Sequence, residues 1–343
     1  MHIVIIGSGI AGVSFAEKCL ALKASTPNST IAINITLVTH EHDGYYSRPL
    51  LSRGFTKTDI ENTIILKKFD KIRDSGINVL SGAEVTAIDR HSKTIALDSV
   101  QERTLHYDIL VLAQGSEAFI PPPYQPFKKL FFCLNSLVDL KAIRAFRHTL
   151  VNQNRKPHWA IIGGGLIGCE LASDLAVAGD NVTVFHAVER LMERQLVVED
   201  SALLLNVLHK SGVTVLFNQN IQAISQQAEK VAIQTDVFTE FDGLIVACGF
   251  KPRTDLAKQA GLNVGRGIKV NTFLQTNDDS IFALGDCAEL PNGKLYAYIL
   301  PIRSQATWLA SFILQQEHTP WTAPVFTSKA KVHGFEAVYP YNV

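Results

Sequence analysis

Cysteine is scarce in this chain and follows no pattern. The 343 residues contain five cysteines, none of them paired in a CxxC or CxxxxC spacing, at positions 19, 133, 169, 248 and 287. Without these spacings the sequence predicts neither a zinc ribbon nor a redox-active pair of cysteines close together in the chain. We expect the cysteines to be small buried residues. The stretch His40-Glu41-His42-Asp43 is better explained as a polar loop after a strand than as a metal site. No metal site is therefore predicted.

The sequence also lacks an excess of charge and a long apolar run. Lysine and arginine total 32, and so do aspartate and glutamate, which gives no basic field for nucleic acid or a membrane surface. No stretch reaches the roughly 18–20 apolar residues of a membrane span. The amino terminus has no basic leader, and Gly7 and Gly9 interrupt its apolar run, so we predict no signal peptide. We expect a cytoplasmic protein with neither nucleic acid nor membrane as a partner.

Two glycine fingerprints stand out instead, each between an apolar run and an Ala-rich stretch. The first is Gly7-Ser8-Gly9-Ile10-Ala11-Gly12, and the second is Gly163-Gly164-Gly165-Leu166-Ile167-Gly168. The spacing predicts a strand over 2–6, a helix over about 10–22 and a strand over about 31–39, and then the same order over 158–162, 166–178 and 181–186. Strand, turn and helix in this order indicate a dinucleotide site of the Rossmann type.

The chemistry of the bound group explains the glycines. A pyrophosphate is negative, and the first turn of a helix presents free N–H groups at the positive end of its dipole. Gly7 and Gly163 then allow the tight turn, Gly9 and Gly165 allow the pyrophosphate to approach, and Gly12 and Gly168 let helix pack on strand. Two copies in one chain predict two dinucleotides and redox transfer between them.

Further segments repeat or punctuate this pattern. Residues 107–115 and 241–249 are both apolar strands that end in Ala-x-Gly, which predicts one at the exit of each nucleotide domain. Residues 121–126 are rich in proline and predict a non-helical connection between domains. The apolar strand before Gly285-Asp286 ends in an acid that needs a polar partner if it is buried. A flavin ribityl hydroxyl would serve, and the alternative is that Asp286 caps a following helix.

The order of these motifs resembles that of FAD-dependent pyridine nucleotide-disulphide oxidoreductases over nearly the whole chain. The motifs are Gly7-x-Gly9-x-x-Gly12, Ala113-Gln114-Gly115, Gly163-x-Gly165-x-x-Gly168-x-Glu170, Ala247-x-Gly249 and Gly285-Asp286. More narrowly, Tyr46-Ser47-Arg48-Pro49-Leu50-Leu51-Ser52 is similar to the flavin-side loop of rubredoxin reductases and of the reductase that serves flavorubredoxin.

The resemblance implies a role for each matching residue. Gly7, Gly9, Gly12, Ala113, Gly115, Gly285, Asp286 and Pro301 would bind FAD, with Arg48 and Pro49 against the flavin ring. Gly163, Gly165, Gly168, Glu170 and Gly249 would bind the nicotinamide nucleotide. Arg48 and Glu170 are the implied catalytic residues, with Arg48 stabilising negative charge on the reduced flavin. The alternatives are a solvated loop charge for Arg48 and an ordinary first-turn helix acid for Glu170.

The resemblance also implies the architecture. We expect an α/β protein with two Rossmann-like domains of the glutathione-reductase type and a short remnant of an α+β interface domain. The implied ranges are 1–117 with 246–318 for FAD, 118–245 for NAD(P)H and 319–343 for the interface domain. The chain stops at Tyr339-Pro340-Tyr341-Asn342-Val343, which is shorter than the family pattern.

The function implied is an NADH:rubredoxin-type reductase. Disulphide reductases of this fold have CxxxxC where this chain has Tyr46 to Pro49, so electrons would pass from FAD directly to a small acidic carrier: rubredoxin, flavorubredoxin or ferredoxin. The alternatives are a ferredoxin reductase of an oxygenase system, a nitrite reductase component, and a non-catalytic or impaired flavoprotein. NADH is favoured over NADPH, although His186 stands where a ribose-binding acid is usual. The oligomeric state is left open.

Overall fold

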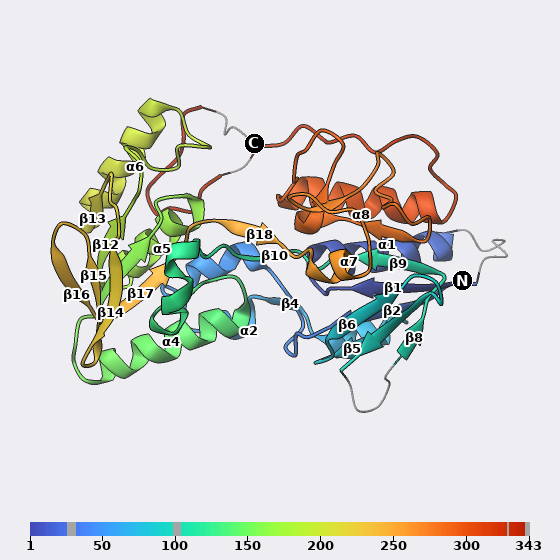
Figure 1. The fold of residues 1–343 in the computed structure, drawn as a ribbon, viewed down its shortest axis with the longest axis horizontal. Coiled ribbons are helices and arrows are strands. Elements are labelled where there is room, and N and C mark those ends of the chain that lie inside the picture. Colours follow the sequence, from blue (N-terminus) through green and yellow to red (C-terminus); the bar gives the residue numbers. More distant parts are fainter. Residues whose placement is uncertain (26–31, 99–103, 328, 340–343) are drawn as a thin grey trace. The chain divides into compact units, whose positions relative to one another are not determined.

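The chain folds into two compact units, each built around a parallel sheet (Figure 1). The structure, a computed structural model, describes residues 1–25, 32–98, 104–327 and 329–339. Unit 1 comprises residues 1–47, 65–117 and 251–326, and unit 2 comprises 48–64, 118–250 and 327–343. The predicted α/β class with two Rossmann-like units is confirmed. The bounds of these units differ from those of the predicted FAD, NAD(P)H and interface domains, which stay a prediction. Residues 340–343 of the predicted interface domain lie outside the described residues.

Unit 1 contains a five-stranded parallel sheet in the order β20-β9-β1-β2-β5. Its strands are short and largely apolar, and the central ones are buried on both faces, as is usual in parallel sheets. Their bounds are β1 (His2–Ile6), β2 (Asn34–Thr39), β5 (Asn78–Ser81), β9 (Ile109–Leu112) and β20 (Ile281–Ala283). The predicted strand over 2–6 is thus confirmed, and the predicted strand over about 31–39 begins at Asn34, with residue 31 outside the described residues.

Helices cover one face of this sheet and a small antiparallel sheet covers the other (Figure 1). On the helical face, α1 (Ile10–Ser25) packs against α8 (Ile299–Ile313). The antiparallel sheet consists of β6 (Val85–Asp89), β7 (Thr94–Leu97) and β8 (Thr104–His106). Smaller elements complete the unit: β3 (Tyr45–Tyr46), β4 (Ile65–Lys67), α3 (Phe69–Asp74), α7 (Asp255–Gln259), β19 (Ile268–Lys269), η3 (Gly285–Cys287) and β21 (Ala288–Glu289).

Unit 2 repeats the same plan with a four-stranded parallel sheet in the order β13-β12-β11-β17. The strands are β11 (His158–Ile162), β12 (Asn181–Phe185), β13 (Val213–Leu216) and β17 (Gly243–Val246). In both units the fingerprint strand lies between the strand that follows its helix and the later Ala-x-Gly strand, with Ile6 opposite Leu112 and Ile162 opposite Val246. The predicted correspondence of residues 107–115 and 241–249 is confirmed.

Alternation along β11 divides the core of unit 2 between two layers. Ala160 and Ile162 face the antiparallel sheet of β14 (Ala223–Gln227), β15 (Lys230–Gln234) and β16 (Phe238–Phe241). Trp159 points the other way, where its ring centroid lies 5.7 Å from that of Phe146 in α4 (Leu137–Asn152). The other helices are α2 (Ile60–Thr63), α5 (Leu166–Val177) and α6 (Val198–Lys210), with 3-10 turns η1 (Arg48–Arg53) and η2 (Pro122–Leu130).

The proline-rich connection is not free of helix, contrary to our prediction. Residues Pro122–Leu130 form 3-10 turns. Proline fixes φ near the value that a 3-10 turn uses, and at the start of a helix its missing N–H leaves no bond unmade. Two of the chain's passages between the units fall within β10 (Ser116–Ala118) and β18 (Phe250–Pro252), which pair with each other. Within the described ranges, no helix is long and apolar enough to cross a membrane.

Candidate functional site

The two fingerprints have the same backbone geometry. Gly7 and Gly163 both have φ of +114°, a left-handed value that side chains rarely adopt. A Cβ on Gly7 would lie 2.3 Å from the carbonyl oxygen of Ala113, and one on Gly163 would lie 2.4 Å from that of Ala247. The alanine of each Ala-x-Gly strand exit therefore closes on the first glycine of its fingerprint, which explains why the two motifs recur together.

The other two glycines of each fingerprint differ in what surrounds them. A Cβ on Gly12 would lie 2.0 Å from the Gly7 carbonyl oxygen, and one on Gly168 would lie 1.9 Å from that of Gly163, so these glycines are required by the turn itself. A Cβ on Gly9 or Gly165 would meet nothing within 4 Å. Open space beside the first turn of α1 and of α5 is what a pyrophosphate requires, so both sites fit a dinucleotide.

Gly115 and Gly249 stand at the same place in the two units. Each follows the exit alanine by two residues and has a positive φ, +68° for Gly115 and +108° for Gly249. A Cβ at either position would meet nothing within 4 Å. Both predicted cofactor-binding glycines thus border open space near their fingerprint.

Asp286 lies in a 3-10 turn and caps no helix. The turn η3 runs from Gly285 to Cys287 and is followed by β21, so the alternative of a helix cap is wrong. The hydroxyl of Ser116 donates to Asp286 Oδ2 over 2.8 Å. A carboxylate at a strand exit can accept from several donors at once, which suits the predicted ribityl contact.

The loop at Gly285 is fixed from α8. The backbone N–H of Gly285 donates to Gln305 Oε1 over 2.8 Å, and Gln305 is fully buried. Pro301 is the third residue of α8 and is buried, where a missing N–H breaks no helical bond. Gln305 is a positioning residue that the sequence analysis missed, although a glutamine on an apolar helix face is a readable signal.

A buried carboxylate also lies beyond the first fingerprint. Glu41 is 5% exposed and accepts a hydrogen bond of 2.7 Å from the Tyr46 hydroxyl. Its backbone N–H donates to Thr39 Oγ1, which in turn lies 2.8 Å from Ser8 Oγ of the fingerprint. This places an acid near the end of β2, where an acid that binds ribose is usual.

Glu170, predicted to bind the nicotinamide nucleotide, is engaged by groups of its own unit. It lies in α5, is 3% exposed, and accepts from Ser52 Oγ at Oε2 over 2.6 Å. Its Oε1 accepts from both the backbone N–H and the ammonium of Lys331, over 2.8 and 2.6 Å. Ser52 and Lys331 were not identified from the sequence as site residues.

Arg48 and Pro49 begin the 3-10 turn η1 of unit 2. The Arg48 guanidinium donates to the carbonyl oxygen of Asn135 over 2.8 Å. The Pro49 carbonyl accepts from the Ser52 hydroxyl over 3.4 Å. A solvated loop charge, the alternative for Arg48, therefore does not fully describe this residue. Its guanidinium binds a backbone carbonyl just before α4.

His186 occupies the end of β12 as a buried, neutral ring. Its Nδ1 accepts from the N–H of Gly164 over 3.0 Å, and its Nε2 lies 2.9 Å from the carbonyl oxygen of Arg190, to which it donates. An imidazole with one accepting and one donating nitrogen carries no charge. Glu193 Oε2 lies 3.4 Å from Nε2, and the Arg190 guanidinium donates to the carbonyls of Glu193 and Leu196.

All five cysteines are free thiols, three of them buried and two partly exposed. Burial raises the pKa of Cys19 and Cys248 to about 12 and that of Cys133 to about 11. Such thiols are protonated near neutral pH and are poor nucleophiles. The prediction of small buried thiols is confirmed for Cys19, Cys169 and Cys287, whereas Cys133 and Cys248 are partly exposed.

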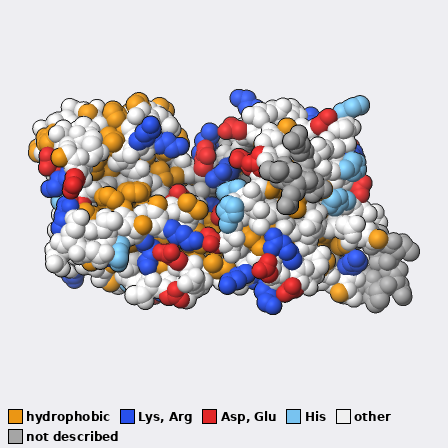
Figure 2. All heavy atoms as spheres, turned by 90° about the horizontal axis from the view of Figure 1, so that it is seen from below, with side chains coloured by type: hydrophobic (Ala, Val, Ile, Leu, Met, Phe, Trp, Pro, Cys, Tyr) orange, Lys and Arg blue, Asp and Glu red, His pale blue; other side chains and the backbone are white. Residues whose placement is uncertain are grey.

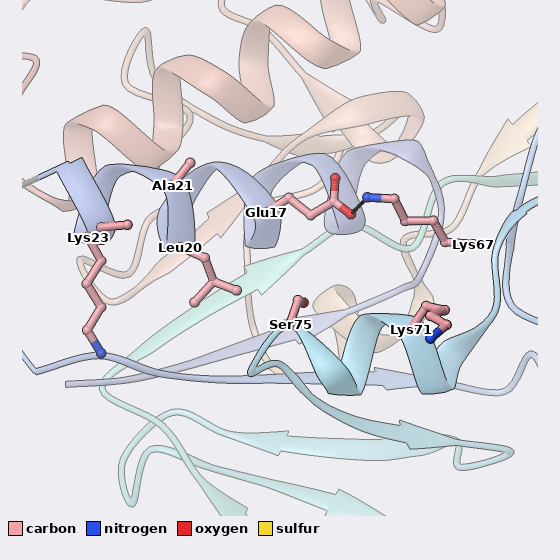
Figure 3. Close-up of a pocket in the computed structure, with 8 residues that line it drawn as sticks. Glu17, Leu20, Ala21, Lys23, Lys67, Lys71 and Ser75 are labelled. Carbon is pink, nitrogen blue, oxygen red and sulfur yellow. Dashed lines mark hydrogen bonds and ion pairs between the residues drawn. The ribbon is translucent and has the colours of Figure 1, made fainter.

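The surface carries charges of both signs. On the face in Figure 2, basic and acidic side chains lie interspersed. In unit 1 a groove between α1 and α3 is lined by Glu17, Leu20, Lys23, Lys67 and Lys71, among others (Figure 3). Lys67 donates to Glu17 across it over 2.5 Å. This groove contains none of the predicted cofactor-binding residues.

The chain matches known proteins over almost its whole length. The family model of pyridine nucleotide-disulphide oxidoreductases matches residues 1–308. The chain is 33% identical to the nitrite reductase [NAD(P)H] of Bacillus subtilis over 98% of its own length but spans only 40% of that protein. It is 31% identical to the nitric oxide reductase FlRd-NAD(+) reductase of Vibrio vulnificus, covering 97% of this chain and 83% of that one.

Solved structures give the same result. The reductase in a putidaredoxin reductase–putidaredoxin complex has a TM-score of 0.83 and 28% identity over 96% of this chain and 79% of that one. The NADH:rubredoxin oxidoreductase of Clostridium acetobutylicum has a TM-score of 0.77 and 27% identity, over 97% and 80% of the two chains. With its two matching fingerprints, this chain belongs to the pyridine nucleotide-disulphide oxidoreductase family.

Proposed function

We propose that the protein is an FAD-dependent reductase that takes electrons from NADH and passes them to rubredoxin or a rubredoxin-like domain. Membership of the family implies FAD and a nicotinamide dinucleotide as cofactors. The observation that carries the proposal is the pair of fingerprints with matching geometry, each with a middle glycine that faces open space. The acceptor is supported by relatives named for flavorubredoxin and rubredoxin. The cytoplasmic location stays a prediction.

The residues of this chain would bind and orient the two nucleotides. The N–H groups at the starts of α1 and α5 would bind the pyrophosphates, and Asp286 would accept from a ribityl hydroxyl. Bound FAD supplies the conversion between hydride transfer and single-electron transfer. The Arg48 guanidinium would supply positive charge that stabilises a more negative flavin ring. All five cysteines are free, and burial raises the pKa of each thiol. Because such thiols are poor redox partners for a flavin, direct electron transfer from FAD to a protein acceptor is favoured.

NADH is the proposed donor because a carboxylate, that of Glu193, lies beside the end of β12 and is paired with the nearby Arg194 guanidinium over 3.6 Å. The His186 ring is neutral, Glu193 lies beside it, and the Arg190 guanidinium is engaged by backbone carbonyls. A carboxylate near this position repels a phosphate and accepts from ribose hydroxyls. The expected preference for NADH is about tenfold in kcat/KM, or about 1.4 kcal/mol.

The nucleotide preference is tested by steady-state kinetics with NADH and NADPH at equal concentrations. Glu193→Gln should lower the ratio of kcat/KM for NADH to that for NADPH, because it removes a charge that repels the 2′-phosphate. Adding His186→Arg should lower this ratio further, because it adds a cation. Glu199→Gln is a matched control, because it makes the same change at an exposed glutamate six residues further along the chain. Faster turnover with NADPH in the unmodified protein would show that the proposed donor is wrong.

The reductase activity itself is tested by anaerobic stopped-flow spectroscopy. NADH should bleach the visible absorbance of bound FAD within seconds. The reduced enzyme should then reduce rubredoxin or flavorubredoxin faster than ferredoxin. A protein that binds FAD but shows no bleaching would instead be a non-catalytic flavoprotein.

A second candidate function is a component of a nitrite reductase. Its support is the 33% identity to the Bacillus subtilis enzyme over 98% of this chain, which spans 40% of that enzyme. The same set of acceptors separates the two candidates. A nitrite reductase component would pass its electrons to the remainder of a nitrite reductase and would leave rubredoxin oxidised. Efficient reduction of ferredoxin alone would favour a ferredoxin reductase.

A further inference from the structure

Residues 330–339 of unit 2, here called the strap, are attached to α5 and α6 by side chains that accept from the strap backbone. Ala330, Val332 and Phe335 of the strap are buried. Four of its N–H groups donate over 2.8–2.9 Å, from Lys331 to Glu170, from His333 to Ser173, and from Val338 and Tyr339 to Asp200. The strap is thus a packed part of unit 2, and these four hydrogen bonds attach it to α5 and α6.

Glu170 joins the strap to the loop that begins at Arg48. One carboxylate oxygen accepts from Ser52 of η1, and the other accepts twice from Lys331 of the strap. Glu170 is 3% exposed, and a buried carboxylate without a cation is costly. The Lys331 ammonium, 2.6 Å from Glu170 Oε1, is the cation paired with this carboxylate.

The charged and titratable groups around Glu170 do not replace Lys331. Cys169 is its buried neighbour in α5, and burial raises the pKa of that thiol. Asp174, one turn further along α5, accepts from the Thr56 hydroxyl, and His333 Nε2 and the Arg53 guanidinium lie 3.0 and 4.0 Å from its Oδ1. The Arg53 guanidinium donates to His333 Nε2, so Arg53 and His333 are grouped around Asp174 and not around Glu170.

Ser52 carries the connection to the predicted flavin-side residues. Its hydroxyl lies 2.6 Å from Glu170 Oε2 and 3.4 Å from the Pro49 carbonyl oxygen, inside the same short turn η1. The path from Lys331 through Glu170 and Ser52 to Pro49 therefore consists of direct hydrogen bonds. Arg48 is the residue before Pro49.

We propose that Lys331 is a positioning residue for the Arg48–Pro49 loop, acting through Glu170 and Ser52. The proposal deepens the proposed function and rests on it for the role of Arg48. Lys331 holds Glu170 as an ionised acceptor, Glu170 holds Ser52, and Ser52 fixes the turn that presents Arg48. Loss of the ammonium should loosen this turn while α5 and the second fingerprint keep their fold.

The test compares three variants of the full-length, FAD-loaded protein. Lys331→Met removes the charge but keeps the length of the side chain, and Lys331→Arg keeps the charge. Lys329→Met is the matched control, because Lys329 is an exposed lysine two residues away on the same segment. Hydrogen exchange at residues 51–56 reports the loop directly, and stopped-flow reduction by NADH reports its effect on the flavin.

In Lys331→Met we expect exchange at residues 51–56 to quicken and flavin reduction to slow, each by about tenfold. The slowing should deepen as the pH falls from about 8 to about 6, because a buried carboxylate that has lost its cation takes up a proton at a higher pH. Lys331→Arg should restore both readouts. The double variant Glu170→Gln, Lys331→Met should show no such pH dependence.

Two results would overturn the inference. Exchange at residues 51–56 in Lys331→Met that equals the unmodified protein would show that the ammonium does not position the loop. Slowing that is equally deep at all pH values, or that Lys331→Arg does not restore, would show a merely structural contact. If NADH fails to reduce the unmodified enzyme, the proposed function fails, and the exchange measurement still decides the role of Lys331.

Discussion

At the scale of single residues, the middle and last glycines of one fingerprint exclude a side chain for different reasons. A Cβ on Gly12 would collide with the Gly7 carbonyl oxygen at 2.0 Å, within the protein itself. A Cβ on Gly9 meets no protein atom within 4 Å, and the backbone of Gly9 does not have a positive φ. The protein itself therefore leaves room for a Cβ at Gly9, and a bound cofactor would be the reason for a glycine there.

Two substitutions separate these reasons. Gly9→Val should give a folded protein that has lost FAD, because the new side chain fills the space of the pyrophosphate. Gly12→Ala should destabilise the fold, by about 1–3 kcal/mol as for overpacked cores. FAD content by visible absorbance and thermal unfolding by circular dichroism measure the two effects. A yellow Gly9→Val protein would contradict the assignment of the first fingerprint to FAD.

The contrast between these glycines and Glu170 shows how far single residues can be read from a sequence. The fingerprint positions are local, so spacing alone predicted the turns at Gly7 and Gly163. Glu170 was predicted to bind a nucleotide, but its partner Lys331 is 161 residues away in the chain. Nothing in the local pattern indicates which distant cation meets a buried acid, because tertiary packing decides it.

At the scale of elements, residues 48–64 depend on α4 and α5 of unit 2. Arg144 of α4 donates to the carbonyls of Lys57 and Thr58 over 3.2 and 2.8 Å and also to that of Gly54. It pairs with Glu61 over 2.8 Å. One guanidinium thus satisfies several carbonyls of the turn between η1 and α2.

Arg144→Met should expose this segment to proteolysis. Losing several charge-assisted hydrogen bonds costs about 1–3 kcal/mol locally, which makes opening about tenfold or more frequent. Tryptic cleavage after the exposed Lys57 should quicken accordingly. Arg194→Met is the control, since the Arg194 side chain is 86% exposed and its ion pair with Glu193 lies outside this segment. Equal cleavage in both variants would contradict the role of Arg144.

Element type was more readable from the sequence than element partners. The apolar runs before each fingerprint predicted β1 and β11, and the Ala-rich stretches predicted α1 and α5. The polar residues Glu170, Ser173 and Asp174 recur at helical spacing on one face of α5, which signals a polar contact surface but not its partner. The 3-10 turns of η2 were missed because proline was read only as a helix breaker.

At the scale of the whole molecule, the same arrangement of fingerprint, helix and exit strand occurs once in each compact unit. Each nucleotide should therefore stabilise a different part of the chain. A ligand at a hundred times its Kd stabilises the state that binds it by about 2.7 kcal/mol. For amides that exchange only when their unit opens, this corresponds to roughly hundredfold slower exchange.

Hydrogen exchange with each nucleotide alone measures this division. FAD added to the apoprotein should slow exchange at residues 7–13 and 285–287, and NAD⁺, which leaves the flavin oxidised, should slow it at residues 164–169. The reason is that each pyrophosphate engages the N–H groups of one helix start, α1 or α5. Residues 213–216 of β13, which lie in unit 2 but away from the second fingerprint in sequence, show whether NAD⁺ also slows exchange that requires opening of the whole unit. The glycine geometry is the same in both fingerprints and does not by itself say which nucleotide each one binds. Slower exchange at residues 7–13 with NAD⁺, and not with FAD, would therefore reverse the assignment of the two fingerprints.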